Sequence, residues 1–389
     1  MADLIRDAPL GQLIRWASKN KYLQYPEEKA GFELPRPWQD VLDSLGGLAD
    51  DGFREPPPPS SSSSTVADED RQMQQQEDQE KQEDQEGQPA PGQGRLEKTQ
   101  SVPVVPQRTE DGTILVDWYY SDDAENPHNW SNKKRVLIAT VICLYTFVVY
   151  TSSAIYTSSI EGLRAQWGVS ELKASLGLSL YVLGYGIGPL VFSPLSEIPR
   201  IGRSPVYTVT MFLFVVISIP TAFAPNFAGL MVLRFLQGLF GSPCLASGGA
   251  SLGDMYSLQM LPYAMVAWVS AAYCGPALGP LLSGFAVPAK SWRWALYESV
   301  WASSPIFLAM LFSLPETSGP TILLRRAQRL RKLTGNDRFM SQSEIDQRNM
   351  KVSSIALDAL IKPMEITIKD PAVLFVQIYT AIIYGIYYS

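Results

Sequence analysis

Two charged side chains lie inside long apolar stretches of this sequence. A charge in such surroundings is costly, and it usually has a partner or a function. One of them is Arg234, in a run that reads Leu-Met-Val-Leu-Arg-Phe-Leu-Gln-Gly and that also contains Gln237 and Gly238. An arginine inside an apolar helix costs free energy unless it faces a polar interior or a partner, so Arg234 is a candidate for handling charge. Because it lies about one helical turn from the end of its stretch, the alternative is that its guanidinium reaches out to the interface.

The other is Glu298, which follows Trp292-Arg293-Trp294 by about one turn and is the carboxylate placed furthest inside an apolar stretch. A carboxylate in such a place is a candidate for carrying a proton. Its position near the end of the stretch favours the plainer alternative, a hydrogen bond at the interface.

A turn with acidic and basic side chains, Ser193–Pro205, separates two of the apolar stretches. Glu197 and Arg203 can pair across the ends of the two predicted helices, and Asp254, at the end of a later stretch, can join them. Gly202 gives the backbone the freedom that this turn requires. We call these side chains the latch residues, because ion pairs among them would hold one conformation; the alternative is a basic loop that only orients the chain. The latch residues are Glu197, Arg200, Gly202, Arg203 and Asp254.

The segment Cys274–Gly284 is rich in glycine and proline within an apolar stretch. Gly275, Gly279 and either Ser283 or Gly284 fall on one helical face, where another helix can approach closely. The prolines remove ladder hydrogen bonds and favour a bend. The alternative is a packing helix of small residues with no moving role. The segment contains the pattern Gly275, Pro276, Gly279, Pro280 and Gly284.

Six apolar segments must position these residues, and each is about 20 residues long, which is enough to cross a bilayer as a helix. They are Val136–Tyr156, Ala174–Leu195, Val206–Ala224, Gly229–Leu252, Ala264–Val287 and Ala295–Leu314. A seventh segment, Pro371–Tyr388, begins before the chain stops at Ser389. We therefore predict an all-α membrane protein with a six-helix bundle and a seventh helix.

The composition excludes several other classes of protein. The net charge is −6, the 3 cysteines lie in apolar stretches, and the 1 histidine has no companion ligands, so we expect no nucleic-acid partner, disulfide, metal or cofactor. The sequence lacks a P-loop for ATP and a pair of nucleophile and base, so we do not expect an enzyme.

The chain divides into regions of different character. A helix at Asp7–Lys19 has an apolar face and could lie on the membrane, dock on the bundle or be weakly ordered. The arginines of Arg325–Lys332 are expected to contact anionic lipid, with a specific lipid or nucleotide site as the alternative. Gly335 should end their helix, and Ser341–Glu344 should cap the next one. The predicted regions are an N-terminal cytoplasmic segment (1–51), a disordered linker (52–105), a pre-membrane segment that folds against the bundle (106–135), the bundle (136–315), a cytoplasmic linker with surface helices (316–370) and the seventh helix (371–389).

Basic residues are concentrated in alternate loops, which predicts that the N-terminus and those loops are cytoplasmic. The basic residues that set this orientation are Lys133, Lys134, Arg135, Arg200, Arg203, Arg325, Arg326, Arg329, Arg331 and Lys332.

These patterns resemble the drug:proton antiporters of the major facilitator superfamily, over 117–388. The Ser193–Pro205 turn is similar to the family's loop signature, with Ser193 for its first glycine and two extra residues before Gly202. Leu-x-x-x-Arg-x-x-Gln-Gly around Arg234 and the glycine–proline pattern of Cys274–Gly284 resemble two further signatures, and Met1–Ile14 looks like the start of fungal benomyl/fluconazole resistance proteins.

The resemblance implies a multi-pass protein of the plasma membrane that exports small amphipathic compounds in exchange for protons, in contact with membrane lipids. It also implies that Arg234 tunes a proton site. A complete member has a second bundle of six helices, so we expect a chain ending at Ser389 not to transport by itself. The alternatives are a truncated, non-transporting fragment and a half-transporter that acts as a dimer or as an interaction partner.

Overall fold

The structure, a computed structural model, describes residues 2–29, 31–47, 101–109, 111–347, 361 and 365–388. The chain forms two compact units, one of residues 1–34 and 104–389 and the other of residues 35–103. In the second unit, helix α3 spans Arg36–Gly47. Most of the linker expected at 52–105 lies outside the described residues; its last part, from Ser101, is described, and the Val104 amide donates to the Tyr119 carbonyl.

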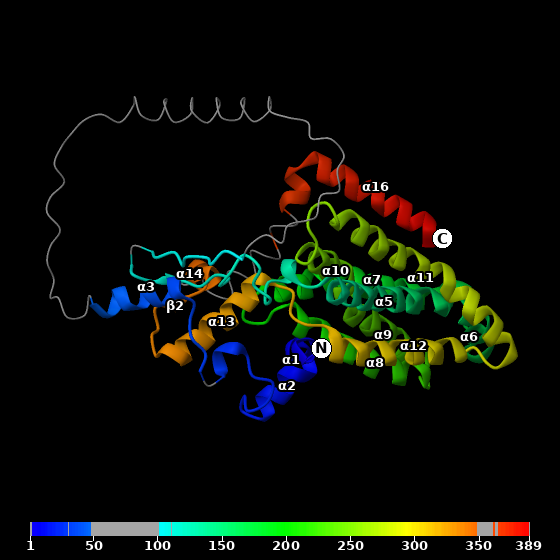
Figure 1. Ribbon diagram of the computed structural model, residues 1–389. Coiled ribbons are helices and arrows are strands. Elements are labelled where there is room, and N and C mark those ends of the chain that lie inside the picture. Colours follow the sequence, from blue (N-terminus) through cyan, green and yellow to red (C-terminus); the bar gives the residue numbers. More distant parts are fainter. Residues whose placement is uncertain are drawn as a thin grey trace, which may run out of the picture. The chain divides into compact units, whose positions relative to one another are not determined.

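Six membrane-length apolar helical spans occur among the described residues, and they lie alongside one another in Figure 1. This confirms the predicted six-helix bundle. The spans are α5 (Asn132–Ala154) continued by η3 (Ile155–Ser159) and α6 (Ile160–Trp167), then α7 (Glu171–Glu197), α8 (Arg203–Ala222), α9 (Phe227–Gly241) with α10 (Pro243–Gly253), α11 (Leu261–Ala289) and α12 (Trp294–Ser313). Helix α16, Pro371–Tyr388, is the seventh.

Helices α7 and α9 pack tightly because glycines line their contact. A Cβ atom at Gly184 would overlap the Phe235 carbonyl, and one at Gly188 would overlap Ser242. Small residues let two backbones approach in a membrane, where apolar burial between helices gives little driving force. Glycines also line the contact between α5 and α11.

The pre-membrane segment folds against the bundle, as the sequence predicts. Trp130 is 5% exposed and belongs to the same buried cluster as Tyr145 and Phe214 of the bundle. Earlier in the same segment, strand β1 (Ile114–Leu115) pairs in parallel with β2 (Phe339–Met340). This pairing ties the segment before the bundle to the segment that follows it.

Two surface helices follow the bundle. Helix α13 spans Gly319–Thr334 and ends at Gly335, whose φ of 67° lies in the left-handed region that favours glycine. Helix α14 spans Gln342–Gln347. Ser341 Oγ accepts from the Glu344 amide at 3.3 Å, and Glu344 Oε2 accepts from the Ser341 amide at 3.2 Å, which is the predicted capping box.

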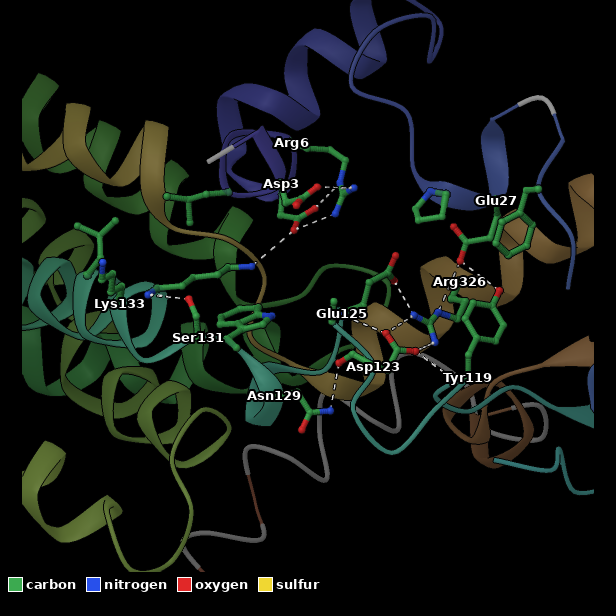
Figure 2. Close-up of a pocket in the computed structure, with 18 residues that line it drawn as sticks. Asp3, Arg6, Glu27, Tyr119, Asp123, Glu125, Asn129, Ser131, Lys133 and Arg326 are labelled. Atoms are coloured by element: carbon green, nitrogen blue, oxygen red, sulfur yellow. Dashed lines mark hydrogen bonds and ion pairs between the residues drawn. The ribbon is translucent and has the colours of Figure 1, made fainter. Parts of the chain in front are cut away.

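The prediction that the arginines of α13 contact lipid is wrong for Arg326 and Arg329, because both are buried against carboxylates. Arg326 lies 2.6 Å from Asp123 and 3.1 Å from Glu125 (Figure 2). Arg329 lies 3.1 Å from Glu27. Burial raises the pKa of Asp123, but the hydrogen bond and charge of Arg326 outweigh it and hold that pKa below its usual range. These ion pairs join three segments that are distant in the sequence into one module.

The helix predicted at Asp7–Lys19 is α2, which spans Pro9–Ala17 with Pro9 in its first turn, and a separate helix that the sequence did not predict, α1 (Ala2–Asp7), precedes it. Pro9 has no amide hydrogen and disfavours a helical conformation at Ala8, so α2 starts anew there. Arg15 lies on the face of α2 that is turned toward the rest of the protein. Arg15 is 6% exposed and donates two hydrogen bonds to Glu28, each 2.8 Å long.

Candidate functional site

The Arg234 side chain lies wholly inside the bundle, at 0% exposure. Its guanidinium donates to the carbonyl oxygens of Ser152 at 2.9 Å, Ser153 at 3.0 Å and Gly177 at 3.3 Å. It also donates to the Gln237 side chain at 3.0 Å. Ser152 and Ser153 are in the last turn of α5, where carbonyl oxygens lose their intrahelical partners. The end of one helix thus supplies the acceptors that a buried guanidinium requires.

Two tyrosine rings complete the surroundings of Arg234. The guanidinium carbon lies 4.7 Å from the ring centre of Tyr156 and 4.5 Å from that of Tyr181, which is the range of cation–π contacts. Each ring is held in turn, because the Tyr156 hydroxyl donates to the Ala174 carbonyl and the Tyr181 hydroxyl donates to the Val149 carbonyl, both at 2.8 Å. We call Arg234 with its carbonyl and tyrosine contacts the arginine cage.

Gln237 and Gly238 have separate structural roles beside the cage. Gln237 donates from Nε2 to Ser218 Oγ at 2.7 Å, which links α9 to α8. A Cβ atom at Gly238 would overlap the Tyr181 carbonyl, so only glycine allows α7 this close.

The cage decides between two interpretations of Arg234. Its guanidinium does not reach out to the interface, since the groups to which it donates all lie within the bundle. Among the described residues, no carboxylate forms an ion pair with it. A role in tuning a proton site therefore has to act through the backbone and the two tyrosines.

A contact between two serine hydroxyls links the arginine cage to α12, the helix that carries Glu298. Ser152, whose carbonyl binds Arg234, has its Oγ 2.7 Å from Ser299 Oγ of α12. Glu298 precedes Ser299 in the chain and is half-buried. The Glu298 Oε2 atom is buried and has no hydrogen-bond partner among the described residues.

Three of the latch residues, Glu197, Arg203 and Asp254, meet at one end of the bundle, which we call the latch end. Arg203 lies 3.0 Å from Glu197 and forms a second ion pair with Asp254, so α7, α8 and the end of α10 are joined. Gly202 has a φ of 82°, a conformation that favours glycine. Arg200 is exposed, and no contact of its side chain is found among the described residues.

Glu316 is the member of this cluster that the sequence does not reveal. It is 4% exposed and accepts hydrogen bonds from the backbone amides of Arg203, Thr317 and Ser318 at 3.1 Å and of Ser204 at 3.3 Å. A carboxylate at the start of α8 satisfies donors that the helix leaves free and complements its dipole. Glu316 therefore fastens the turn before α8 to the segment after α12.

The small-residue face of α11 packs against α5 and η3. A Cβ atom at Gly275 would lie 2.9 Å from the Phe147 carbonyl, and one at Gly279 would lie 3.0 Å from the Thr151 carbonyl. Ser283 completes this face, with Oγ 2.7 Å from Ser158 Oγ, whereas a Cβ atom at Gly284 would meet nothing within 4 Å. Of the two residues left open by the sequence, Ser283 is the one in contact. Helix α11 continues through Pro276 and Pro280.

Substitution of Gly279 by leucine should therefore disrupt the bundle, whereas substitution of Gly284 by leucine should not. The added side chain at 279 meets backbone atoms that cannot move away, and overpacking of this kind costs about 1–3 kcal/mol or more. Thermal unfolding of the two purified variants in detergent would test this difference. Equal unfolding temperatures for Gly279→Leu and the parent chain would contradict the close packing of α11 and α5.

Two hollows accompany these sites. One, of about 710 Å³, lies between α1, η1 (Pro26–Glu28) and the pre-membrane segment; Figure 2 shows its lining, with Asp3 beside Arg6 and Arg326 among Glu27, Asp123 and Glu125. Most of its charges are already paired with each other. The other, of about 600 Å³, is an apolar groove between α5 and α11, lined by residues such as Cys143, Phe147 and Tyr263.

The sequence of this chain matches the Major Facilitator Superfamily over residues 142–389, and the chain belongs to that family. Among characterised fungal proteins it is 43% identical over 389 residues to the MFS-type transporter pyvG of Aspergillus violaceofuscus, covering 100% of this chain and 65% of the relative. It is 42% identical over 279 residues to the cycloheximide resistance protein of Candida maltosa, covering 71% of this chain and 50% of the relative. The chain thus spans between half and two thirds of the length of these relatives.

A further relative is the fluconazole resistance protein 1 of Saccharomyces cerevisiae, 41% identical over 273 residues, which cover 70% of this chain and 50% of the relative. Among solved structures, the xylose transporter XylE from E. coli is similar with a TM-score of 0.42 and 15% identity, over 62% of this chain and 61% of that one.

Proposed function

We propose that this chain forms the N-terminal bundle of a proton-coupled exporter of small amphipathic organic compounds. The observation that carries the proposal is the arginine cage: a cation with no carboxylate partner among the described residues is kept at 0% exposure inside a membrane bundle. Intramembrane charge of this kind is expensive, and it is typical of proteins that move ions or substrates. The names of the relatives, which include cycloheximide and fluconazole resistance, support toxic organic compounds as the substrate class.

In this proposal the charged residues have distinct roles. Glu298 carries the proton, because its buried oxygen has no other hydrogen-bond partner among the described residues. Arg234 binds the Ser152 carbonyl, and the Ser152 hydroxyl contacts Ser299 of α12. Through these contacts Arg234 positions the part of α12 that carries Glu298. Gln237 and Gly238 fix the cage in place.

The latch residues hold the bundle in one of its conformations. Arg203 with Glu197 and Asp254 would separate when the latch end opens, while Gly202 lets the turn change direction. The small-residue face of α11, with Gly275 and Gly279, is the surface along which the helices shift, and Pro276, Pro280 and Gly284 lie within the same helix. Opening of such contacts is how alternating access exposes a site near the midplane.

The apolar groove between α5 and α11 is the place where we expect the substrate to enter the bundle. Its volume of about 600 Å³ lies in the range of sites for small organic molecules. Its lining by aromatic and aliphatic side chains such as Phe147, Tyr256 and Tyr263 suits an amphipathic compound.

The proposed membrane is the plasma membrane, with the N-terminus and latch end in the cytosol. The basic residues in the first turn of α5 and those of α13 support this orientation, because short basic segments stay cytoplasmic. A single cysteine introduced as Ser343→Cys should be protected from an impermeant thiol reagent in intact cells, and its labelling there would reverse the orientation.

Export by a chimera tests the proposed function. The chain is joined to the part of the pyvG transporter that it does not match, and the chimera is expressed in yeast that lacks its own drug exporters. We expect efflux of a fluorescent drug that stops when the proton gradient is dissipated. A chimera that reaches the membrane folded but does not lower the cellular drug content would contradict the proposal.

The same assay with residues 1–389 alone separates the remaining alternatives. We expect no export by this chain, since a midplane site needs two bundles. Proton-dependent export by it would instead favour the half-transporter that acts as a dimer, and crosslinking would then show whether two copies associate.

A further inference from the structure

Helix α2 buries a charged side chain and exposes its apolar face. Arg15 and Gly11 are buried against the rest of the protein, while Leu13 is 55%, Ile14 38% and Trp16 81% exposed. At about 100° per residue, the outward face from Trp16 to Ile14 is apolar over roughly 160° of the helix surface. A helix on a water-exposed surface would show the reverse arrangement.

The neighbours of α2 place it near the latch end of the bundle. Helix α2 contacts α12 and α8, and α1 also contacts α12 (Figure 1). Asp7, at the end of α1, lies 3.8 Å from Lys134 in the first turn of α5. The start of α8 and the end of α12 are adjacent there, since Ser204 Oγ donates to the Leu314 carbonyl at 2.9 Å.

The two helices that α2 contacts, α8 and α12, expose apolar side chains of their own. Helix α8 exposes Val209 and Phe212, at 56% and 50%, and the last turns of α12 expose Phe312 at 49%. These side chains lie in membrane-length helices, so their exposed faces belong to the lipid-facing belt. Just beyond α2, Lys19 and Lys21 are both exposed.

We propose that α2 is seated in the surface of the bilayer leaflet at the latch end, with its outward face among the acyl chains and its lysines at the headgroups. Tryptophan is enriched at this depth because its ring is apolar while its N–H group is polar. Lysines beside such a helix favour anionic lipid. An apolar helix face of this kind gains free energy from burial in the interface, which it would not gain in water.

The occupant of this surface is therefore lipid, and not a second copy of the chain. The inward face of α2 is fixed by bonds within the protein, from Arg15 to Glu28 and to the Leu23 carbonyl at 2.6 Å. The helix cannot rotate its apolar face inward without breaking these bonds. The bilayer is the apolar phase that already surrounds the neighbouring faces of α8 and α12.

A spin label on α2 tests this inference independently of transport. In the full chain with Cys143, Cys244 and Cys274 replaced by alanine, single cysteines are introduced as Trp16→Cys or Leu13→Cys and labelled with a nitroxide. The protein is reconstituted in vesicles of phosphatidylcholine and phosphatidylserine. Val209→Cys serves as the lipid-exposed reference and Gln342→Cys, exposed on α14, as the water-exposed one.

We expect both α2 labels to collide with oxygen several times more often than with a water-soluble nickel chelate, at a depth between the two references. Lys19→Glu with Lys21→Glu should shift the labels toward the nickel chelate. Labels that behave like the one at Gln342 would overturn the inference. Magnetic broadening between labels on two copies, with exclusion of both reagents, would also overturn it, because a second chain would then cover the face.

Discussion

Replacing Arg234 by alanine is expected to abolish proton-coupled export and to lower the stability of the bundle. The substitution leaves the carbonyl oxygens of Ser152, Ser153 and Gly177 without their donor and opens a cavity between Tyr156 and Tyr181. The loss of a large buried side chain together with its hydrogen bonds should cost about 2–5 kcal/mol. The measurement is export by the chimera, together with the unfolding temperature of the purified protein.

Two further substitutions separate charge from geometry at this position. Arg234→Lys keeps the positive charge but not the planar set of donors, so it should recover part of the stability and little of the export. Arg164→Ala is the matched control, because Arg164 pairs only across the surface with Glu171, a type of contact worth about 0–1 kcal/mol. Export at the parent rate by a folded Arg234→Ala protein would show that the cage is structural, and the proposed mechanism would fail.

The second large effect is expected at Glu316. Its carboxylate accepts from four backbone amides, those of Arg203, Ser204, Thr317 and Ser318. Glu316→Ala leaves these buried donors without an acceptor, at about 1–3 kcal/mol for each group that finds no replacement. A net loss of about 3 kcal/mol corresponds to a decrease of roughly 6–12 °C in the unfolding temperature.

The control for Glu316 is glutamine, which keeps one acceptor oxygen and the shape of the side chain. Glu316→Gln should therefore lose less stability than Glu316→Ala, because the amide oxygen can take the place of Oε1, which accepts from three of the four amides. Thermal unfolding in detergent compares the two variants with the parent. If alanine at 316 is tolerated without any decrease, the turn before α8 is held by the ion pairs of Arg203 alone.

The spans could be predicted from sequence because length and apolar composition alone determine them in a membrane. The contacts of the buried charges could not. Arg234 is solvated by backbone carbonyls, which carry no sequence signal, and Glu316 binds amides that are 112 and 113 residues away in the chain. The polar residues Thr151-Ser152-Ser153, which interrupt an apolar run before η3, are a sequence signal for a polar site at this point of the bundle.

The arginines of α13 illustrate a different difficulty. A basic run after a membrane segment usually predicts lipid contact, because local sequence shows the charge but not its partner. Arg326 and Arg329 find their carboxylates in segments more than 200 residues earlier, at Glu27, Asp123 and Glu125. Only tertiary structure brings these charges together.

That separation orders the events of biosynthesis. Glu27 and Arg329 are 302 residues apart in the chain. During synthesis, Glu27 therefore has no Arg329 to pair with until all six membrane-length helices have been made. At about 5–20 residues per second, the wait is roughly 15–60 s. The module can close only when α12 has returned the chain to the side on which the N-terminus was left. The ion pairs of the module therefore form only after the nascent bundle has crossed the membrane an even number of times.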